Sequence, residues 1–367
     1  MHIRDGILSP EVCLAAGVLA TAAVGYSLRR MRLALDDRAV PLTGMMAAVV
    51  FAGQMVNFPL FGLPVSGHLL GGVLAAAVVG PWAGCVALSV VLIVQAVLFA
   101  DGGLLSLGPN ILNMAVVGCW GGYAVFATVR RWSGSLFPSP GASLGEGQGE
   151  GAFLPLQPRD KTTLTPHPSP TEAAGEGSRS RRPAVFAAVV AAYVSVLAAA
   201  ALFCAEFALS SRQAPFDLSQ LTLWMVLYHA LIGVGEAAIT GAVLSFVWSR
   251  RPELLTAAEP GTTLSRGGRF VTAGATVACA VAAILSPWAS SWPDGLEAVG
   301  ERVGFNELGV DRMLMLSDYA VPLPAGWEVW SVSAAGVLGT VVVLGVGWLL
   351  CLRPSAATTL SDGQHAG

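Results

Sequence analysis

One apolar stretch, HLLGGVLAAAVVGPW at residues 68–82, decides how the chain is arranged. It carries no Asp, Glu, Lys or Arg, and its Gly and Ala residues allow helices to approach closely in a membrane. The stretch is shorter than the roughly 20 residues that a helix needs to cross the hydrocarbon core of a bilayer. The orientation of every later segment depends on whether it crosses.

Longer apolar runs lie on both sides of this stretch. Runs long enough to cross a bilayer, or nearly so, lie at 11–28, 42–57, 84–100, 108–128, 184–210, 221–247, 270–288 and 330–352. Of the 367 residues, 54% are hydrophobic and 12% are charged, far fewer charges than a soluble domain carries. The sequence therefore predicts an all-α polytopic membrane protein. It has a bundle of about seven transmembrane helices and a C-terminal two-helix module with an extracytoplasmic loop.

Basic residues near the helix ends predict the orientation, because cytoplasmic loops carry an excess of Arg and Lys. With the N-terminus outside and nine crossings, 68–82 included, sixteen basic residues lie inside and four outside. We expect a multi-pass protein of a bacterial-type plasma (inner) membrane with an extracytoplasmic N-terminus. No small-residue cleavage site follows the first apolar run, so we expect the N-terminal segment to be retained.

Changes in composition mark the predicted domain boundaries. The membrane domain spans 1–249, and within it residues 131–182 are rich in Gly, Pro, Ser, Thr and Glu, which predicts a disordered cytoplasmic insertion. Residues 250–267 are a predicted cytoplasmic linker, and 268–353 form a second module with an acidic outer loop. Residues 354–367 are a predicted disordered tail.

Several classes of protein are excluded by composition. The chain has a single lysine, Lys161, and no Gly-Lys pair, so it has no Walker A loop for ATP hydrolysis. Its net charge of −3 gives no basic field for nucleic acid. The six cysteines occur singly, without the paired spacing of a zinc ribbon or a disulfide framework. We therefore expect no ATP hydrolysis by the chain itself and no nucleic-acid partner.

The first residues, MHIRDGILSP, carry the groups that point most directly to metal chemistry. The Met1 amine, the His2 amide nitrogen and the His2 imidazole can close adjacent chelate rings around one cation. His68, at the expected outer mouth of the third crossing, can add a fourth nitrogen. Four nitrogens in a plane suit Ni(II) and Cu(II) and are available to Co(II). Taken alone, each histidine has a simpler structural interpretation, with His68 bonded to a carbonyl at a helix start.

Further polar side chains lie at membrane depth, where an ionisable group costs several kcal/mol unless it has a partner or faces a cavity. Glu206 lies in one crossing, and His229 and Glu236 share a face of the next. Asn110 and Asn113 follow a stretch interrupted by Gly and Pro, a feature of transporter substrate sites. These residues either surround a metal site or have structural roles as helix locks and caps.

Four separated blocks carry a resemblance to a known family. They are MHIRDGILSP, NFPLFGLPVSGHLLGG, ADGGLLSLGPNILNMA and HALIGVGEAAIT. Together they resemble the metal-specific membrane subunit of cobalt and nickel energy-coupling-factor transporters, the CbiM/NikM type, across 1–249 apart from 131–182. The stretch SSWPDGLEAVGERVGF resembles the PDGLE element of the small CbiN/NikN-like accessory subunit, which suggests a fusion of the two. That element consists of Pro293, Asp294, Gly295, Leu296 and Glu297.

The resemblance implies a substrate-capture subunit of an ATP-driven uptake transporter, embedded in the lipid bilayer, whose substrate is Ni(II) or Co(II). It implies that the chain is not an enzyme and holds no prosthetic group, and that the metal ligands are Met1, His2 and His68. It also implies partners: a transmembrane coupling subunit and cytoplasmic ATPase subunits. The family usually has Pro where this chain has Arg4, and we expect Arg4 to face solvent or to pair with Asp5.

Two other classes remain open from the residues alone. An ion-coupled secondary metal transporter would use Glu206 and Glu236 as proton sites, but the sequence shows no internal repeats. A membrane metalloenzyme would use His229 and Glu236 as ligand and general base, but no HExxH motif is present. The PDGLE loop either loads the cation or stabilises its module, and the sequence does not distinguish nickel from cobalt.

Overall fold

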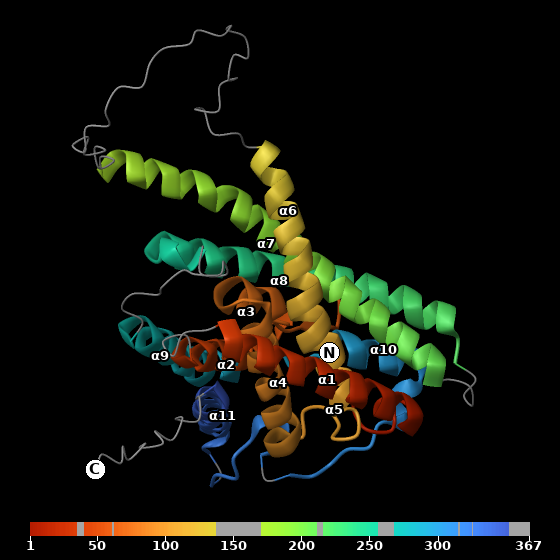
Figure 1. Cartoon of the computed structure of the whole chain (residues 1–367). Helices are drawn as coiled ribbons and strands as arrows, with labels where there is room; N and C mark the ends of the chain where they lie inside the picture. The colour runs from red at the N-terminus through yellow and green to blue at the C-terminus, as the bar shows by residue number, and fades with distance from the viewer. Residues whose placement is uncertain are drawn as a thin grey trace, which may run out of the picture.

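The computed structural model describes residues 1–34, 40–60, 62–136, 170–210, 216–255, 268–314, 316–324 and 326–351. Within these residues, seven helices are long and apolar enough to cross a membrane. The predicted all-α polytopic membrane fold is therefore confirmed (Figure 1). The predicted tail and most of the predicted linker lie outside the described residues.

The N-terminal domain contains eight α-helices among the described residues. They are α1 (Pro10–Ala34), α2 (Val40–Gln54), α3 (Gly72–Val79), α4 (Pro81–Val94), α5 (Leu107–Asn110), α6 (Gly122–Leu136), α7 (Pro170–Ser210) and α8 (Leu218–Arg250). Two π-helical segments, η2 (Gln95–Phe99) and η3 (Ile111–Gly121), continue α4 and α5. A short antiparallel hairpin pairs β1 (Phe58–Pro59) with β2 (Ser66–Gly67).

The C-terminal module contains α9 (Gly268–Ile284), α10 (Gly295–Val303) and α11 (Glu328–Cys351). Short 3-10 turns complete the described structure: η5 (Pro252–Leu255), η6 (Ser286–Trp288), η7 (Phe305–Leu308) and η8 (Ser317–Tyr319). Helices α9 and α11 pack against α2, and α10 packs against α8. Close approach here requires glycine, because a Cβ on Gly44 of α2 would lie 2.9 Å from the Leu344 carbonyl oxygen of α11.

The stretch 68–82 does not form the predicted transmembrane helix. Its helix, α3, has 8 residues and lies between Gly71 and Gly80, whose φ angles of 77° and 84° favour glycine and interrupt the helix. Helix α2 is also short, with 15 residues. The expected crossing at 68–82 is therefore corrected to a short helix, too short to span a bilayer alone.

Even so, α3 reverses the chain as the nine-crossing arrangement requires. One hydrophobic cluster gathers the end of α1, the start of α2, the end of α3 and the start of α4: Leu28, Met31, Val40, Val79, Trp82, Ala83 and Val86. At the opposite ends, Gln54 of α2 and Gln95 of η2 are hydrogen bonded beside the N-terminus. The first four helices therefore run alternately between the same two levels.

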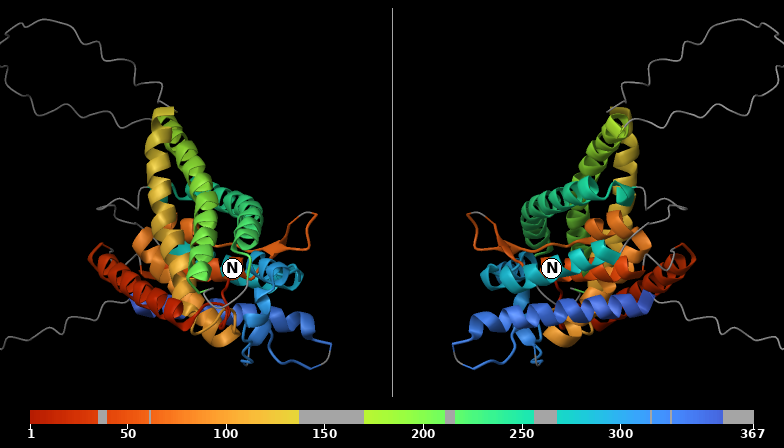
Figure 2. Two further views of the ribbon diagram at one scale, coloured as in Figure 1. Left: turned by 90° about the vertical axis from the view of Figure 1, so that its right-hand side faces the viewer. Right: turned by 90° about the vertical axis from the view of Figure 1, so that its left-hand side faces the viewer.

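Two helices extend into the range 131–182, which was predicted to be disordered. Helix α6 continues to Leu136 and α7 begins at Pro170, so only 137–169 of this range lies outside the described residues. Residues 131–136 and 170–182 are thus helical in this structure, and the disorder of 137–169 stays a prediction. Figure 2 shows α6 and α7 side by side and projecting beyond the other helices.

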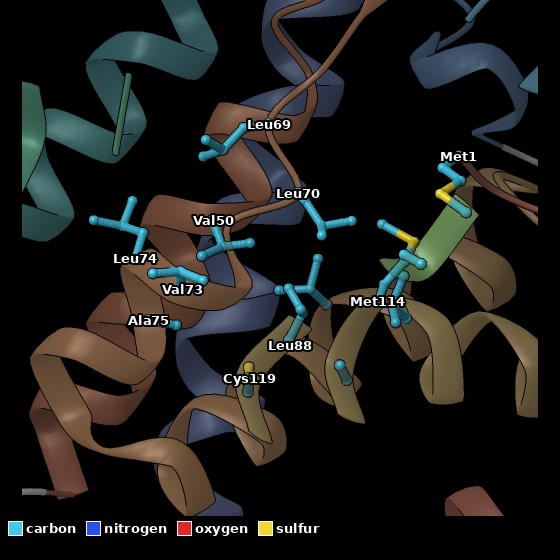
Figure 3. Packing of buried hydrophobic residues seen from close by; sticks show 14 of the residues in the cluster. Met1, Val50, Leu69, Leu70, Val73, Leu74, Ala75, Leu88, Met114 and Cys119 are labelled. Carbon is cyan, nitrogen blue, oxygen red and sulfur yellow. The ribbon is translucent and has the colours of Figure 1, made fainter. Parts of the chain in front are cut away.

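The chain's first residues lie inside this bundle. Met1 is only 6% exposed and Ile3 is fully buried. Met1 belongs to the main hydrophobic cluster together with Leu70 and Met114 (Figure 3). The N-terminal segment, defined as residues 1–9, is thus part of the core, and its polar groups must find partners there.

Candidate metal centre

The N-terminal segment is fixed by hydrogen bonds to the loop and helix that follow η2. The Asn110 side chain pairs with Ile3 like a strand partner: Oδ1 accepts from the Ile3 amide at 2.8 Å, and Nδ2 donates to the Ile3 carbonyl at 3.0 Å. The Asp5 carboxylate accepts three backbone N–H groups at 2.8–3.1 Å, from Leu104, Leu105 and Ser106. These contacts satisfy the buried polar groups and place the terminal amine inside the bundle.

Glycine at 103 is required by the same contact. A Cβ there would lie 1.9 Å from Asp5 Oδ1 and 2.5 Å from the Asp5 nitrogen. The DGG sequence, which alone suggests an ordinary turn, therefore allows the loop to close around Asp5.

Met1 and His68 meet at the centre. The terminal nitrogen lies 2.5 Å from His68 Nε2. His68 Nδ1 lies 3.1 Å from the Leu69 carbonyl oxygen, which accepts its N–H and leaves the Nε2 lone pair facing the amine. A metal-binding histidine uses this arrangement. Neighbouring nitrogen ligands on one metal, each at about 2.0 Å, lie about 2.8 Å apart, close to the observed spacing.

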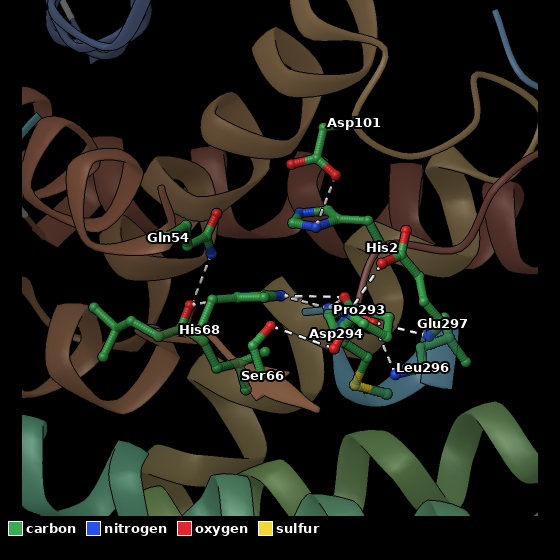
Figure 4. Close-up of polar contacts among 12 residues, drawn as sticks. His2, Gln54, Ser66, His68, Asp101, Pro293, Asp294, Leu296 and Glu297 are labelled. Atoms are coloured by element: carbon green, nitrogen blue, oxygen red, sulfur yellow. Dashed lines mark hydrogen bonds and ion pairs between the residues drawn. The ribbon is translucent and has the colours of Figure 1, made fainter. Parts of the chain in front are cut away.

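His2 lies beside these two groups, but its ring nitrogens face other partners. The His2 and His68 rings are stacked, with centroids 5.3 Å apart and an interplanar angle of 19°. His2 Nδ1 lies 3.1 Å from Asp101 Oδ1 (Figure 4). His2 Nε2 lies 3.2 Å from Gln95 Oε1. A neutral imidazole has one N–H, so it can donate to only one of these two oxygens. Chelation by His2 therefore requires the ring to leave Asp101.

The electrostatic surroundings keep the His2 ring neutral. Burial lowers its pKa to about 4, and the nearby Met1 ammonium and His68 act in the same direction, while the negative charge of Asp101 opposes them. Within the described ranges, no group of three or more His, Cys, Asp or Glu residues is placed to hold a metal ion. The Met1 amine, which lies 2.5 Å from His68 Nε2, is a further candidate donor.

The PDGLE element reaches the same centre. Asp294 Oδ2 accepts from the terminal amine at 2.6 Å and lies 3.6 Å from His68 Nε2. Burial raises the pKa of Asp294, but the terminal ammonium and His68 outweigh this effect and hold it well below its usual value. The negative charge of Asp294, together with burial, raises the pKa of Glu297 to about 7.

Backbone pairing sets the position of Asp294. Strand β2 lies against residues 292–294: the Ser66 amide donates to the Pro293 carbonyl at 2.8 Å, and Ser66 pairs with Asp294 in a parallel bridge. The next residue, Gly295, allows close approach to α8, because a Cβ there would lie 2.5 Å from Ile232 Cδ1 and 3.2 Å from His229 Cε1. The register thus brings Asp294 and His68 together.

The remaining predicted polar residues take separate positions. His229 Nδ1 lies 2.9 Å from the Met225 carbonyl, and His229 lines a small cavity together with Met1 and His68. Glu236 accepts from the amides of Leu70 and Gly71 at 2.6 and 2.9 Å, satisfying the N-terminal end of α3.

Asn113 lies in η3 and donates to Glu206 Oε2 at 2.8 Å. This contact is with α7, whereas Asn110 contacts the N-terminal segment. Of the two predicted asparagines, the structure brings only Asn110 to the candidate centre.

The expected pairing of Arg4 with Asp5 is wrong. Arg4 Nη1 lies 2.7 Å from Asp311 Oδ1, and Arg4 also donates to the Asn306 side chain. Asp5 instead pairs with Arg312, with 2.8 Å between Nη2 and Oδ2. Asp5 thus contacts both the 104–106 loop and the C-terminal module, whereas the Arg4 side chain contacts the module.

Sequence reasoning missed several residues around His2. Gln95 Nε2 donates to Gln54 Oε1 at 2.9 Å, and Tyr319 donates its hydroxyl proton to Asp101 Oδ2 at 2.5 Å. The sequence does contain a signal for Gln54 and Gln95. Both amides lie inside apolar runs, where a polar side chain needs a partner, which marks them as candidate site residues. Gln95 also lies in a π-helical segment, a frequent marker of functional sites.

A cavity of about 540 Å³ adjoins the centre. Its lining includes His2 and His68 together with four acidic side chains: Asp101, Asp294, Glu297 and Asp311. Arg4 and Arg312 line it as well, so acidic side chains outnumber basic ones four to two. A lining with more acidic than basic groups raises the local concentration of cations. The candidate centre is thus open to an acidic chamber that favours cations.

The fold and the site define a class of protein: a multi-pass membrane protein with a buried centre at its N-terminus and an accessory module closed over that centre. The chain belongs to the CbiM family, described as the cobalt uptake substrate-specific transmembrane region, which matches residues 2–145 and 171–254. Residues 268–353 match the PDGLE domain. The chain is therefore a fusion of the two, as its motifs predicted.

Named metal transport proteins are similar to this chain and support its assignment to the CbiM family. A protein of Archaeoglobus fulgidus named as a fused nickel transport protein, NikMN, is 29% identical over 353 residues, which cover 95% of this chain and 98% of that protein. The fused nickel transport protein NikMN of Rhodobacter capsulatus is 33% identical, with 70% and 64% covered. The cobalt transport protein CbiM of Geobacter sulfurreducens is 28% identical, with 83% and 77% covered.

A solved structure shares the fold. The crystal structure of a truncated transition metal transporter matches 68% of this chain and 99% of that chain, with a TM-score of 0.50 at 24% identity. Membership of a cobalt and nickel transport family sets aside the metalloenzyme alternative.

Proposed function

We propose that this chain captures Ni(II) or Co(II) for an ATP-driven uptake transporter. The ligands are the Met1 amine, the His2 amide and imidazole nitrogens, and His68 Nε2. The observation that carries this proposal is the 2.5 Å spacing between the Met1 nitrogen and the correctly oriented Nε2 of His68. When the cation binds, the His2 ring turns from Asp101 to the metal. This contact with Asp101 is replaceable, because the neutral ring has one N–H for two acceptors, Asp101 and Gln95.

Two residues of α8 support the centre without contacting the cation. Glu236 holds the amides of Leu70 and Gly71, directly after His68, and so fixes where the His68 ring stands. His229 packs beside Gly295 and supports the PDGLE element. The Glu236 carboxylate is engaged as a helix cap, which fits this role better than that of a proton site in a secondary transporter.

Energy comes from partner subunits. The chain contains no Walker A loop, so cytoplasmic ATPase subunits hydrolyse ATP and a transmembrane coupling subunit transmits the change. We place the N-terminus on the extracytoplasmic side, because most basic residues near the helix ends then lie on the cytoplasmic side. A membrane vesicle with a proton gradient but without the ATPase subunits therefore does not accumulate metal, whereas a secondary transporter would.

The decisive experiment is metal analysis of the purified full chain after incubation with Ni(II) or Co(II). The native start is compared with two variants that carry the same short extension, one before Met1 and one after Gly367. We expect stoichiometric metal with the native start and with the C-terminal extension, and none with the N-terminal extension, which abolishes the terminal amine. Stoichiometric metal in the N-terminally extended chain would contradict the ligand set.

The PDGLE module has a loading role in this proposal. It contacts the terminal amine through Asp294, Arg4 through Asp311 and Asp5 through Arg312. Removing residues 268–353 should therefore lower metal uptake by cells that contain the partner subunits. Wild-type uptake after this deletion would leave the module with a stabilising role alone.

A further inference from the structure

One carboxylate oxygen of the PDGLE element faces the proposed metal ligands and is not needed by its own helix. Asp294 Oδ1 accepts from the amides of Leu296 and Glu297 at 2.8 and 2.9 Å and so caps α10. Oδ2 points the other way, to the terminal amine at 2.6 Å and toward His68 Nε2 at 3.6 Å (Figure 4). One oxygen of Asp294 therefore caps its own helix, and the other faces the terminal amine and His68.

We propose that Asp294 is itself a ligand of the cation, an oxygen donor on one side of the nitrogen plane. The proposal rests on the proposed function, because it adds a fifth donor to the four nitrogens named above. It assigns the accessory module a direct contact with the transported ion.

Geometry selects this position. The chelate formed by Met1 and His2 takes three corners of the plane and His68 takes the fourth, so a further donor can stand only above or below the plane. A donor there lies next to all four nitrogens, at about 2.9 Å from each when every bond is about 2.0–2.1 Å. The distances of Oδ2 from the Met1 and His68 nitrogens, 2.6 and 3.6 Å, lie on either side of this value.

The carboxylate is also held in place. The cap on α10, the pairing of Ser66 with residues 292–294 and the close contact of Gly295 with α8 all restrain the backbone of Asp294. Its side chain is only 12% exposed. Metal sites need donors restrained in this way, because a loosely held carboxylate loses conformational entropy on binding.

Charge points to the same assignment. A divalent cation bound to a deprotonated amide leaves one positive charge in a buried site, and a buried charge is costly unless it is paired. Asp294 provides the matching negative charge. The same carboxylate also pairs with the terminal ammonium at 2.6 Å. Asp294 thus carries the charge that either cation, the ammonium or the metal, needs at this position.

A fifth donor changes which ions fit. Four planar nitrogens suit Ni(II) and Cu(II) best. An additional oxygen out of the plane makes the site more accommodating to Co(II), which does not require a plane. Asp294 thus acts as a specificity-determining residue of the fused chain.

X-ray absorption at the nickel edge tests the proposal on the full chain with its native start, loaded with Ni(II) as the probe. The shape of the absorption edge distinguishes Ni(II) with four planar donor atoms from Ni(II) with five. The test variant is Asp294→Ser, because serine still caps a helix but is too short to reach the metal. The matched control is Glu301→Gln, which removes an exposed carboxylate from the same helix.

We expect five donors in the wild type and in Glu301→Gln, and four planar donors in Asp294→Ser. The Ni(II) dissociation constant should rise by about 10–100-fold in Asp294→Ser and remain unchanged in the control. A planar, four-donor spectrum in the wild type overturns this proposal and leaves the proposed function intact. A wild type that binds no Ni(II), or an N-terminally extended chain with the wild-type spectrum, overturns both.

Discussion

The N-terminal segment is held between two regions whose contacts differ in kind. On the side of the membrane domain, Asn110 pairs with the backbone of Ile3 and the loop 104–106 surrounds Asp5. On the side of the C-terminal module, most contacts are ion pairs: Asp294 binds the terminal amine, and Asp311 binds Arg4. One backbone hydrogen bond joins them, from the Val310 amide to the Asp5 carbonyl at 2.7 Å. The membrane-domain contacts are largely buried, whereas the module's outermost contact is exposed.

This difference indicates a division of work. Buried hydrogen bonds to the backbone are costly to break, because each abandoned group lacks a partner. Exposed ion pairs contribute little and weaken in salt. The membrane domain therefore determines where the ligand segment lies, and the module adjusts the charge around the terminal amine.

The largest expected effect comes from closing the space around Asp5. In Gly103→Ala the new Cβ would lie 1.9 Å from Asp5 Oδ1, so the N-terminal segment must move. We expect Ni(II) affinity, measured by equilibrium dialysis, to fall by more than about 100-fold, which corresponds to about 3 kcal/mol. The matched control is Gly25→Ala in α1, where a Cβ meets nothing within 4 Å. Equal affinities in the two variants would show that the loop does not position the segment.

A second test makes the same chemical change on each side. Asn110→Ala removes both partners of Ile3, at a cost of about 1–3 kcal/mol for each unsatisfied group. We therefore expect a loss of about 10–100-fold in Ni(II) affinity. Asn306→Ala removes an acceptor of Arg4 on the module side and should change affinity less than about threefold. A larger effect from Asn306→Ala would reverse the proposed division of work.

The third prediction concerns pH in the metal-free chain. Burial holds the pKa of docked His2 at about 4, below the ordinary value of 6.5. As the pH falls, an undocked His2 takes up a proton first, so docking is fully stable above about pH 6.5 and weakens down to about pH 4. The total loss is up to about 3 kcal/mol.

Hydrogen exchange at the Ile3 amide measures this docking, with amides of α4 as the internal control. We expect Ile3 to lose protection selectively between about pH 6.5 and 4, and metal retention to fall in the same direction between about pH 7 and 5. Constant protection of Ile3 across this range would show that the neutral His2 ring does not stabilise the docked segment.

The sequence predicted much of the fold, because apolar runs report membrane crossings locally. The runs at 84–100, 221–247 and 330–352 correspond closely to α4 with η2, α8 and α11. Local composition was misleading at 68–82, where the glycines at both ends shorten the helix. It was also misleading beside α7, where a helix continues without apolar residues.

The candidate site was predictable only in part. The donor types of Met1, His2 and His68 are visible in the sequence, and two of their nitrogens lie 2.5 Å apart. The contact of His2 with Asp101, and the position of Asp294, depend on pairing between segments far apart in the chain, such as Ser66 with Pro293. No local pattern encodes such a register, so these residues could not be placed before the structure.

The smallest expected effect concerns the exposed ion pair of Arg4 with Asp311, whose carboxylate is 76% exposed. We expect Asp311→Asn to change Ni(II) affinity by less than about fivefold, or about 1 kcal/mol, and added salt to abolish the difference. A double-mutant cycle with Arg4→Ala isolates the pair from effects of either side chain alone. If the coupling matched the loss in Asn110→Ala and persisted in salt, the charged side would also fix the segment's position. The membrane domain would then no longer be the stronger of its two anchors.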